Sequence, residues 1–438
     1  PMGPRHGPPH PPDVRHAPAQ PWRASKLRVP MGPRHGPPHP PTFGTGIVRR
    51  GGGRAMRVTA VTPFLVDPGS GKNWLFVKVE TDGGVTGWGE CYTQADRDES
   101  IAAHVRALGR YLVKRDAAQI RHFTHVAYHD FAAKRGAMDF WSALSGIEQA
   151  LWDIAGKRLG EPVHNLLGGP CRDRIRVYAN GWYGGARTPE AYAARAREVV
   201  ARGFTALKFD PFPGPWRTHV SRRVEDQAVE TVRAVREAVG PDVDVLVEVH
   251  RRLAPVHAVR VAERIEPFRP FWFEEPVSSR DVDGLAEVRA RIRLPVVTGE
   301  ELYGKAEFQP VLQRRAADIL NPDVCSCGGI LELREIAAMA EPVHVVVSPH
   351  NYNSTTVGLA ATLQVAAAIP NFLITEYFVN FEARGRDVAV EPFEVQGGYI
   401  RVPARPGLGL ELREEALRRH GHREFPLRDL PTIETEGP

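Results

Sequence analysis

Short apolar runs alternate with longer amphipathic segments over residues 171–380. The runs are rich in Val, Ile, Leu and Phe, as expected for strands that are buried in a parallel sheet. Helical spacing separates them, for example over 227–239 and 258–265. Eight alternations predict an α/β fold with a (β/α)7–8 barrel of the TIM type rather than an open sheet. The predicted strands are 176–180, 206–209, 244–248, 271–274, 296–298, 318–320, 344–347 and 372–375.

Residues 56–170 have a different pattern, in which strands precede helices. Alternation predicts a strand over 58–66, and two further strands, 74–80 and 85–90, flank the turn sequence Thr81-Asp82-Gly83-Gly84. Helical periodicity follows at 101–112 and, more densely, at 139–159. We therefore expect an N-terminal α+β capping domain over 56–170, ahead of a barrel over 171–380.

The last part of the chain, 381–438, returns to short strand-like patterns. They occur at 388–390 and 399–402, and Pro406-Gly407-Leu408-Gly409 is typical of a turn. We expect this segment to pack back on the capping domain and complete it.

Residues 1–55 differ in composition from everything after them. They contain 14 of the 39 prolines, and the sequence PMGPRHGPPHPP begins at Pro1 and again at Pro30. Nine Arg or Lys residues against Asp13 give the tail a charge of +8, so residues 56–438 carry 5 − 8 = −3. With few large apolar residues the tail is expected to be disordered. We interpret it as an over-extended segment with Met56 as the natural start; the alternative is a native basic arm or proline-rich ligand.

Bulk composition excludes several classes of protein. The chain is 42% apolar and 25% charged, which is typical of a globular domain, and no apolar run reaches the length of a membrane span. A mildly acidic body does not favour nucleic acid as a partner. Four cysteines are too few for a disulfide scaffold of this size, which favours the cytoplasm. We also expect a homo-oligomer.

Polar side chains follow seven consecutive strands of the predicted barrel, at the end where such barrels carry their active sites. Glu248, Glu274 and Glu300 end three of these strands at intervals of 26 residues. Three carboxylates at one barrel mouth repel one another unless a cation lies between them, and hard oxygen ligands suit Mg²⁺. The other strand ends supply Lys208, Asp210, His250, Asp323, His350, Asn351 and Glu376.

Several longer motifs point to a known family when they are taken together. They are SALSGIEQALWDIAGK at 142–157, Leu166-Leu167-Gly168-Gly169, Phe273-Glu274-Glu275-Pro276, Asp323 with Gly328-Gly329-Ile330, and the turn at 406–409. Over about 56–415 the chain resembles the mandelate racemase-like group of the enolase superfamily, close to its acid-sugar dehydratases. The segment 248–255 is similar to the third strand of aldonate and mannonate dehydratases.

This resemblance implies a chemistry and a role for each strand-end residue. Mg²⁺ is expected on Glu248, Glu274 and Glu300, and the substrate is a small sugar acid. His350, oriented by Asp323, removes the proton α to the carboxylate, and His250 protonates the departing hydroxyl. Glu376 hydrogen-bonds the substrate carboxylate. Lys208, which neutralises carboxylate charge, and Asp210 and Asn351 are expected to face the substrate. The predicted reaction converts an aldonate to a 2-keto-3-deoxy acid.

One departure from the family pattern distinguishes the predicted dehydration from the alternative functions. Racemases of the group carry a second lysine, used as a base, where this chain has Asp210. Dehydration is therefore favoured over a racemase or epimerase of hydroxy acids or amino-acid derivatives. A catalytically silent barrel that binds through its basic tail is the other alternative. In the glycine-containing loop 67–72, Lys72 is expected to be a solvated charge rather than a partner for the distal carboxylate of a diacid. Cys325 and Cys327 are not expected to bind metal.

Overall fold

A computed structural model describes residues 55–131, 137–212, 218–425 and 432–433. The predicted tail, apart from Ala55, lies outside the described residues. Those from Ala55 onward belong to one compact unit, Arg54–Pro438.

The N-terminal part is a three-stranded antiparallel sheet covered by helices. Strands β1 (Val58–Val66), β2 (Trp74–Thr81) and β3 (Thr86–Cys91) are neighbours in that order. The predicted turn joins β2 to β3, and Gly84 adopts φ 74° there. The helices are α1 (Asp98–Leu112), α2 (Ile120–Val126), a π-helix (Ala127–Phe131), α3 (Met138–Leu159) and α4 (Val163–Leu166). Helix α3 lies so close to β3 that a Cβ on Gly89 would come within 1.8 Å of the Gly146 carbonyl oxygen.

The barrel is built from eight parallel strands in sequential order. They are β4 (Arg174–Asn180), β5 (Ala206–Phe209), β6 (Asp244–Glu248), β7 (Trp272–Glu274), β8 (Val296–Thr298), β9 (Ile319–Leu320), β10 (Val346–Val347) and β11 (Thr375–Phe378). β11 pairs with β4. The Val347 amide donates to the Asn371 carbonyl (2.8 Å) and the Leu373 amide donates to the Val347 carbonyl (2.9 Å), so the ring closes through residues just before β11. The predicted barrel is confirmed.

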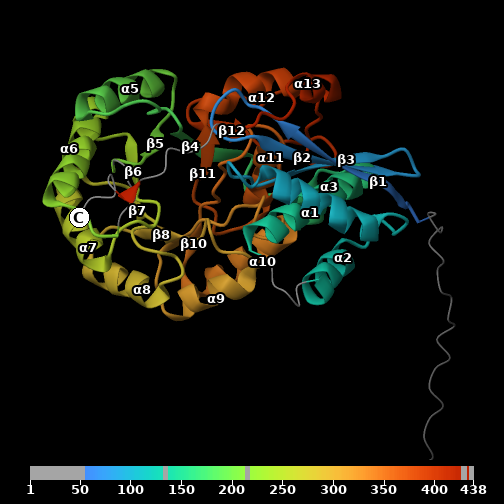
Figure 1. The fold of residues 1–438 in the computed structure, drawn as a ribbon, viewed down its shortest axis with the longest axis horizontal. Coiled ribbons are helices and arrows are strands. Elements are labelled where there is room, and N and C mark those ends of the chain that lie inside the picture. The colour runs from blue at the N-terminus through green and yellow to red at the C-terminus, as the bar shows by residue number, and fades with distance from the viewer. Residues whose placement is uncertain (1–54, 132–136, 213–217, 426–431, 434–438) are drawn as a thin grey trace, which may run out of the picture. The chain divides into compact units, whose positions relative to one another are not determined.

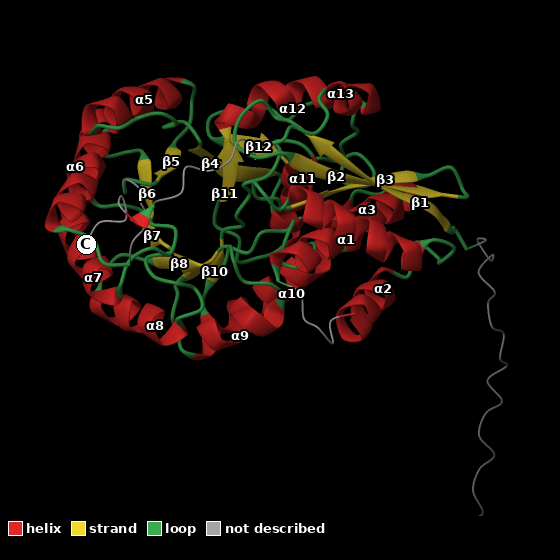
Figure 2. Cartoon of the chain, viewed as in Figure 1, coloured by secondary structure: helices red, strands yellow, loops and turns green. Residues whose placement is uncertain are grey.

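Helices surround these strands, and Figures 1 and 2 show α5 to α9 on the outside of the ring. Helix α11 has 11 of its 12 residues buried, because it also packs against β3 and α4 of the cap. The outer helices are α5 (Pro189–Ala201), α6 (Arg222–Val239), α7 (Pro255–Ile265), α8 (Val282–Arg291), α9 (Lys305–Gln313), α10 (Ile330–Ala340) and α11 (Val357–Ala368). Among the helices that the structure describes, none combines the length and apolar character needed to cross a bilayer.

The structure corrects two of the sequence predictions. The eighth strand runs over 375–378 rather than 372–375, because residues 371–373 make the closing bonds with Val347. The predicted strand at 388–390 is wrong: Val388 ends α12 (Glu382–Val388), and only a single bridge joins Ala389 to Leu412.

The closing segment packs on the cap as expected, and it contacts the barrel as well. Strand β12 (Tyr399–Arg401) pairs antiparallel with barrel strand β4. Helix α13 (Glu414–Arg419) does pack on cap strand β1, and the Asp67 amide donates to the His420 carbonyl (2.9 Å).

Candidate active site

The three glutamates at the ends of β6, β7 and β8 come together as expected. Glu248 and Glu274 are direct neighbours in the parallel pairing of β6 and β7, and Glu300 follows β8 after Gly299, which adopts φ 137°. All three are buried, and one oxygen from each lies within 4.8 Å of the others. The next residues point elsewhere: Glu275 accepts bonds from Thr298 and the Gly299 amide, and Glu301 pairs with Arg251.

A buried lysine and a partly buried arginine lie against this glutamate triad. Lys208 Nζ is 2.6 Å from Glu274, 3.2 Å from Glu248 and 3.0 Å from Glu376. Arg251 pairs with Glu300. Burial raises the pKa of the Glu300 carboxyl, but Arg251, His350 and Lys208 together outweigh it and lower that pKa to about 2. Two cations thus compensate part of the negative charge that the triad gathers.

The negative charge of the glutamate triad is only partly compensated. Burial and the charge on Glu248 raise the pKa of the Glu274 carboxyl well above its ordinary value. Among the described residues, Glu274 Oε2 and Glu300 Oε2 accept no hydrogen bond although both are buried. Buried carboxylate oxygens without donors are costly, and a cation coordinated by oxygen would satisfy them. The donor set therefore fits a divalent metal ion.

His350 and Asp323 form the first of two His–Asp pairs. His350 Nδ1 is 2.7 Å from Asp323 Oδ2, which leaves Nε2 directed at the triad, 3.4 Å from Glu300. Asn353 donates to both Asp323 oxygens at 2.9 Å, and the Cys325 amide donates to one of them at 2.7 Å. Burial lowers the pKa of His350, but Glu300, Glu376 and Asp323 outweigh it and raise that pKa to about 9. A bound divalent cation beside the ring would oppose this rise.

Glu376 is the second residue of β11, and both of its oxygens are engaged. Oε1 accepts from Asn180 at 2.7 Å and lies near Lys208, while Oε2 accepts the Asn351 amide at 3.0 Å. Burial raises the pKa of Glu376, but Lys208 and His350 outweigh it, so the net pKa is lowered. The ionised form is therefore favoured, and it accepts hydrogen bonds but cannot donate one.

His250 and Asp210 form a second His–Asp pair. His250 Nδ1 is 2.7 Å from Asp210 Oδ2. Arg252 pairs with the same carboxylate and donates to the Phe212 carbonyl at 2.9 Å. His250 adopts φ 53°, a left-handed conformation that only a well-packed site maintains in such a residue. Asp210, which we expected to face the substrate, thus has the same relation to His250 as Asp323 has to His350.

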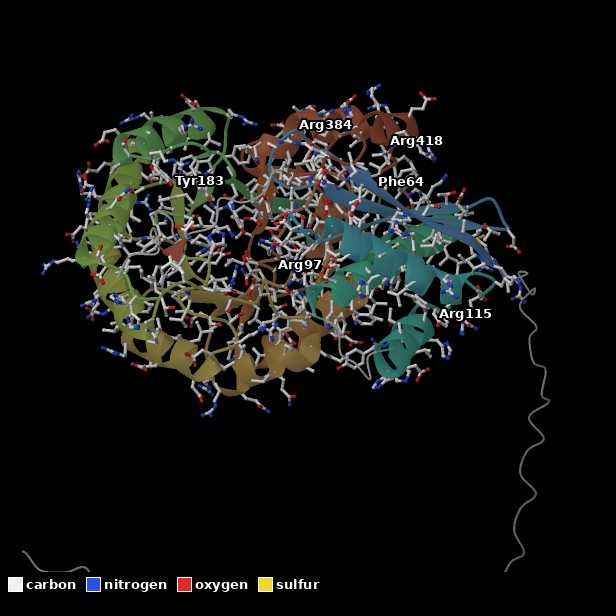
Figure 3. The ribbon with its side chains drawn as sticks, viewed as in Figure 1. Phe64, Arg97, Arg115, Tyr183, Arg384 and Arg418 are labelled. Atoms are coloured by element: carbon white, nitrogen blue, oxygen red, sulfur yellow. The ribbon has the colours of Figure 1, made fainter. Side chains whose placement is uncertain are left out.

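An aromatic cluster packs behind Asp210. Tyr183, labelled in Figure 3, stacks on Tyr192 with ring centroids 5.6 Å apart. Tyr192 Oη donates to the Asp210 carbonyl oxygen (3.1 Å), and Trp182 Nε1 donates to the Lys208 carbonyl oxygen (2.9 Å). These contacts fix the backbone at the end of β5, so the side chains of Lys208 and Asp210 have defined positions.

The two histidines lie on opposite sides of the barrel mouth. His350 follows β10 and His250 follows β6, and strands β7, β8 and β9 lie between them in a ring of eight. The glutamates come from β6, β7 and β8 and therefore lie along the arc of the barrel between the two histidine side chains. A substrate held at the triad would have one His–Asp pair on each side.

The cap contributes residues that were not among the predicted site residues. Tyr92, just after β3, packs against His350 with ring centroids 5.9 Å apart. Lys72 is only 2% exposed, so the expected solvated charge is wrong. Between cap and barrel lies a hollow of about 380 Å³ whose lining includes Tyr92, Arg97 (Figure 3) and Glu301. Cys325 and Cys327 are buried and join no group of potential metal ligands among the described residues.

Comparisons with known proteins agree with this geometry. Residues 58–168 match the mandelate racemase/muconate lactonizing enzyme N-terminal domain, and residues 191–416 match the enolase C-terminal domain-like family. A D-gluconate dehydratase of Thermoproteus tenax is 38% identical over 79% of this chain and 69% of its own. A D-galactonate dehydratase of Ralstonia pickettii is 36% identical over 85% of this chain and 96% of its own. The crystal structure of a mandelate racemase/muconate lactonizing enzyme-like protein from Rubrobacter xylanophilus superimposes with a TM-score of 0.78 at 35% identity, covering 85% of this chain and 99% of that one.

Proposed function

Because the chain belongs to the mandelate racemase/muconate lactonizing enzyme group of the enolase superfamily, we propose that it dehydrates a sugar acid, an aldonate, to a 2-keto-3-deoxy acid. The observation that carries this proposal is the pair of His–Asp couples on opposite sides of a triad of buried carboxylates. Loss of water needs a base for the C2 proton and an acid for the C3 hydroxyl, and the two couples meet both needs.

His350 is the base in this proposal. Its Nε2 takes the C2 proton while Asp323 holds the Nδ1 side of the ring at 2.7 Å. Asn353 keeps the Asp323 carboxylate in place, so the ring has one orientation. The electron pair of the C2–H bond then forms the double bond between C2 and C3 as the hydroxyl leaves.

His250 is the acid, and we assign Asp210 to orienting it rather than to contacting the substrate. Protonation of the C3 hydroxyl converts a poor leaving group into water. The remaining enol ketonises by taking up a proton at C3 and releasing the proton of its C2 hydroxyl. Over the whole reaction the substrate loses one molecule of water. His350 gains one proton and His250 loses one.

We infer that Glu248, Glu274 and Glu300 hold Mg²⁺. Oxygens within 4.8 Å of one another are close to the spacing around such an ion, where opposite ligands are about 4.2 Å apart. When bound, the ion supplies positive charge where negative charge develops on the substrate carboxylate. Lys208 adds a second positive charge there, and we assign Glu376 and Asn351 to positioning Lys208 and His350.

The arrangement favours dehydration over racemisation. The position where a racemase of the group carries its second lysine holds Asp210, whose carboxylate is occupied by His250 and Arg252. The buried triad and both couples also argue against a silent binding protein. A cytoplasmic location and a homo-oligomeric state stay predictions.

A screen of aldonates with Mg²⁺ tests the proposal, with 2-keto acid formation as the readout. The expected result is turnover of at least one aldonate that stops when the metal is chelated and returns when Mg²⁺ is added in excess. Exchange of the C2 proton with D₂O without keto acid would favour the racemase alternative. Turnover that is indifferent to chelation would refute the assigned metal site.

A further inference from the structure

Lys72 is a buried lysine that the proposed reaction does not use. It lies in the loop between β1 and β2, and its ammonium lies between two tyrosine rings, 3.7 Å from the centroid of Tyr92 and 4.3 Å from that of Tyr352. Tyr92 belongs to the cap and Tyr352 follows β10 of the barrel. The lysine therefore lies where the cap meets the barrel mouth.

The ammonium has fewer acceptors than donors. Its three N–H groups have one acceptor among the described residues, the Thr93 carbonyl oxygen at 2.5 Å, and no described carboxylate forms an ion pair with it. Cation–π contact with two tyrosines offsets part of the cost of burial. Donors that remain without acceptors in a buried site are costly, so a ligand oxygen would be stabilised there.

The position of Lys72 places such a ligand next to the reacting atoms rather than at them. Tyr92 separates the lysine from His350, because its ring packs against both. Among the described residues, no hydrogen bond or ion pair joins Lys72 to the glutamate triad or to either His–Asp pair. A sugar acid held at the triad by its carboxylate would reach Lys72 only with the carbons beyond the leaving group.

The surroundings favour hydroxyl groups over a second carboxylate. Asp323, Glu90 and Glu376 all act electrostatically on Lys72, so a further anion would meet three negative groups. Burial nevertheless lowers the pKa of Lys72 to about 7, which weakens its value as a counter-ion. Hydroxyls, in contrast, accept a hydrogen bond from either form of the lysine.

We propose that Lys72 is a specificity-determining residue that hydrogen-bonds the hydroxyls beyond C3 of a long aldonate, selecting six-carbon monoacids over shorter acids and diacids. This inference rests on the proposed function. Its test compares a six-carbon aldonate with the four-carbon acid of the same configuration at C2 and C3, which ends one carbon past the leaving group.

The variants are Lys72→Met, which keeps the length of the side chain, and Lys114→Met as a control that removes an exposed charge from the same cap. Lys72→Met is expected to lower kcat/KM for the six-carbon acid by roughly 10- to 100-fold and for the four-carbon acid by less than about threefold. Where the four-carbon acid turns over slowly, its inhibition constant replaces kcat/KM. Lys72→Arg, which keeps the charge but overfills the space between the rings, serves if the Met variant does not fold; it should show the same selective loss.

Three outcomes would overturn the inference. Equal losses of kcat/KM on the six-carbon and four-carbon acids would mean that Lys72 has a structural role. An unchanged kcat/KM for the six-carbon acid would mean that Lys72 does not contact the substrate. A larger loss of kcat/KM on the six-carbon diacid than on the monoacid would mean that Lys72 binds a carboxylate instead. Turnover of the aldonates by the wild-type protein tests the proposed function independently of Lys72. A failure of the proposed function is therefore distinguished from a failure of the inference about Lys72.

Discussion

Replacing His250 by Asn should separate the two proton transfers of the proposed reaction. Asparagine still reaches Asp210 with its side-chain amide, but it has no proton to give to a leaving hydroxyl. A positioned general acid contributes roughly 10²- to 10⁴-fold, which corresponds to about 3–5 kcal/mol of barrier. His350 and Asp323 lie across the barrel mouth and are untouched by the change. We therefore expect dehydration to fall by that factor while the C2 proton still exchanges.

The assay follows both processes on one sample. Keto acid formation measures dehydration, and loss of the C2 proton signal in D₂O, read by NMR, measures exchange. Asp210→Asn should give the same separation in a weaker form, because the ring of His250 remains but loses its partner. His104→Asn, on an exposed position of α1, is the matched control. Parallel loss of exchange and dehydration, or dehydration within tenfold of wild type, would refute the assignment of His250 as the acid.

Three further predictions concern the charged groups at the barrel mouth. Glu274→Gln should abolish dehydration at Mg²⁺ concentrations that saturate the wild type, and calorimetric titration should show weaker metal binding; unchanged affinity would exclude Glu274 as a ligand. Lys208→Met leaves three buried carboxylates without their shared cation, so the metal-free protein should lose about 3–5 kcal/mol in denaturant unfolding, and Mg²⁺ should restore part of it. The pKa of His350 is raised to about 9, so its contribution to stability is complete below about pH 6.5 and is lost as pH rises through about 9. The metal-free wild type should therefore lose about 3 kcal/mol more than His350→Asn over that range; equal losses would contradict the raised pKa.

The chain's periodicity predicted the elements that carry the site, because strand length and side-chain direction are local properties. Glu248 and Glu274 end strands in register, so spacing alone placed them side by side. The loops that follow the strands have no such periodicity. Arg251, with φ 64°, turns back to pair with Glu300, and nothing in its neighbours indicates that direction.

Non-local contacts account for the other differences between prediction and structure. Burial of Lys72 depends on Tyr352, which is far along the chain, so a glycine-containing loop alone suggested a solvated charge. Similarly, β12 has the pattern of any short strand, and only its pairing with β4 takes it away from the cap. Asp210 was recognised as a departure from the racemase pattern, but its partner was visible only once β5 and β6 were placed together.

The two His–Asp pairs differ in exposure, and this difference suits their proposed roles. The His250 side chain is 29% exposed and that of His350 is 6% exposed. Each turnover removes a proton from the acid and adds one to the base, so both rings must be reset before the next substrate. His250 can regain its proton from solvent through its exposed edge. His350 has no comparable access, so its proton leaves most readily on the enol itself, at C3, when the product ketonises. A barrel mouth with one exposed and one buried couple thus restores both groups: His250 takes one proton from water, and the enol returns one proton to water from its C2 hydroxyl as it ketonises.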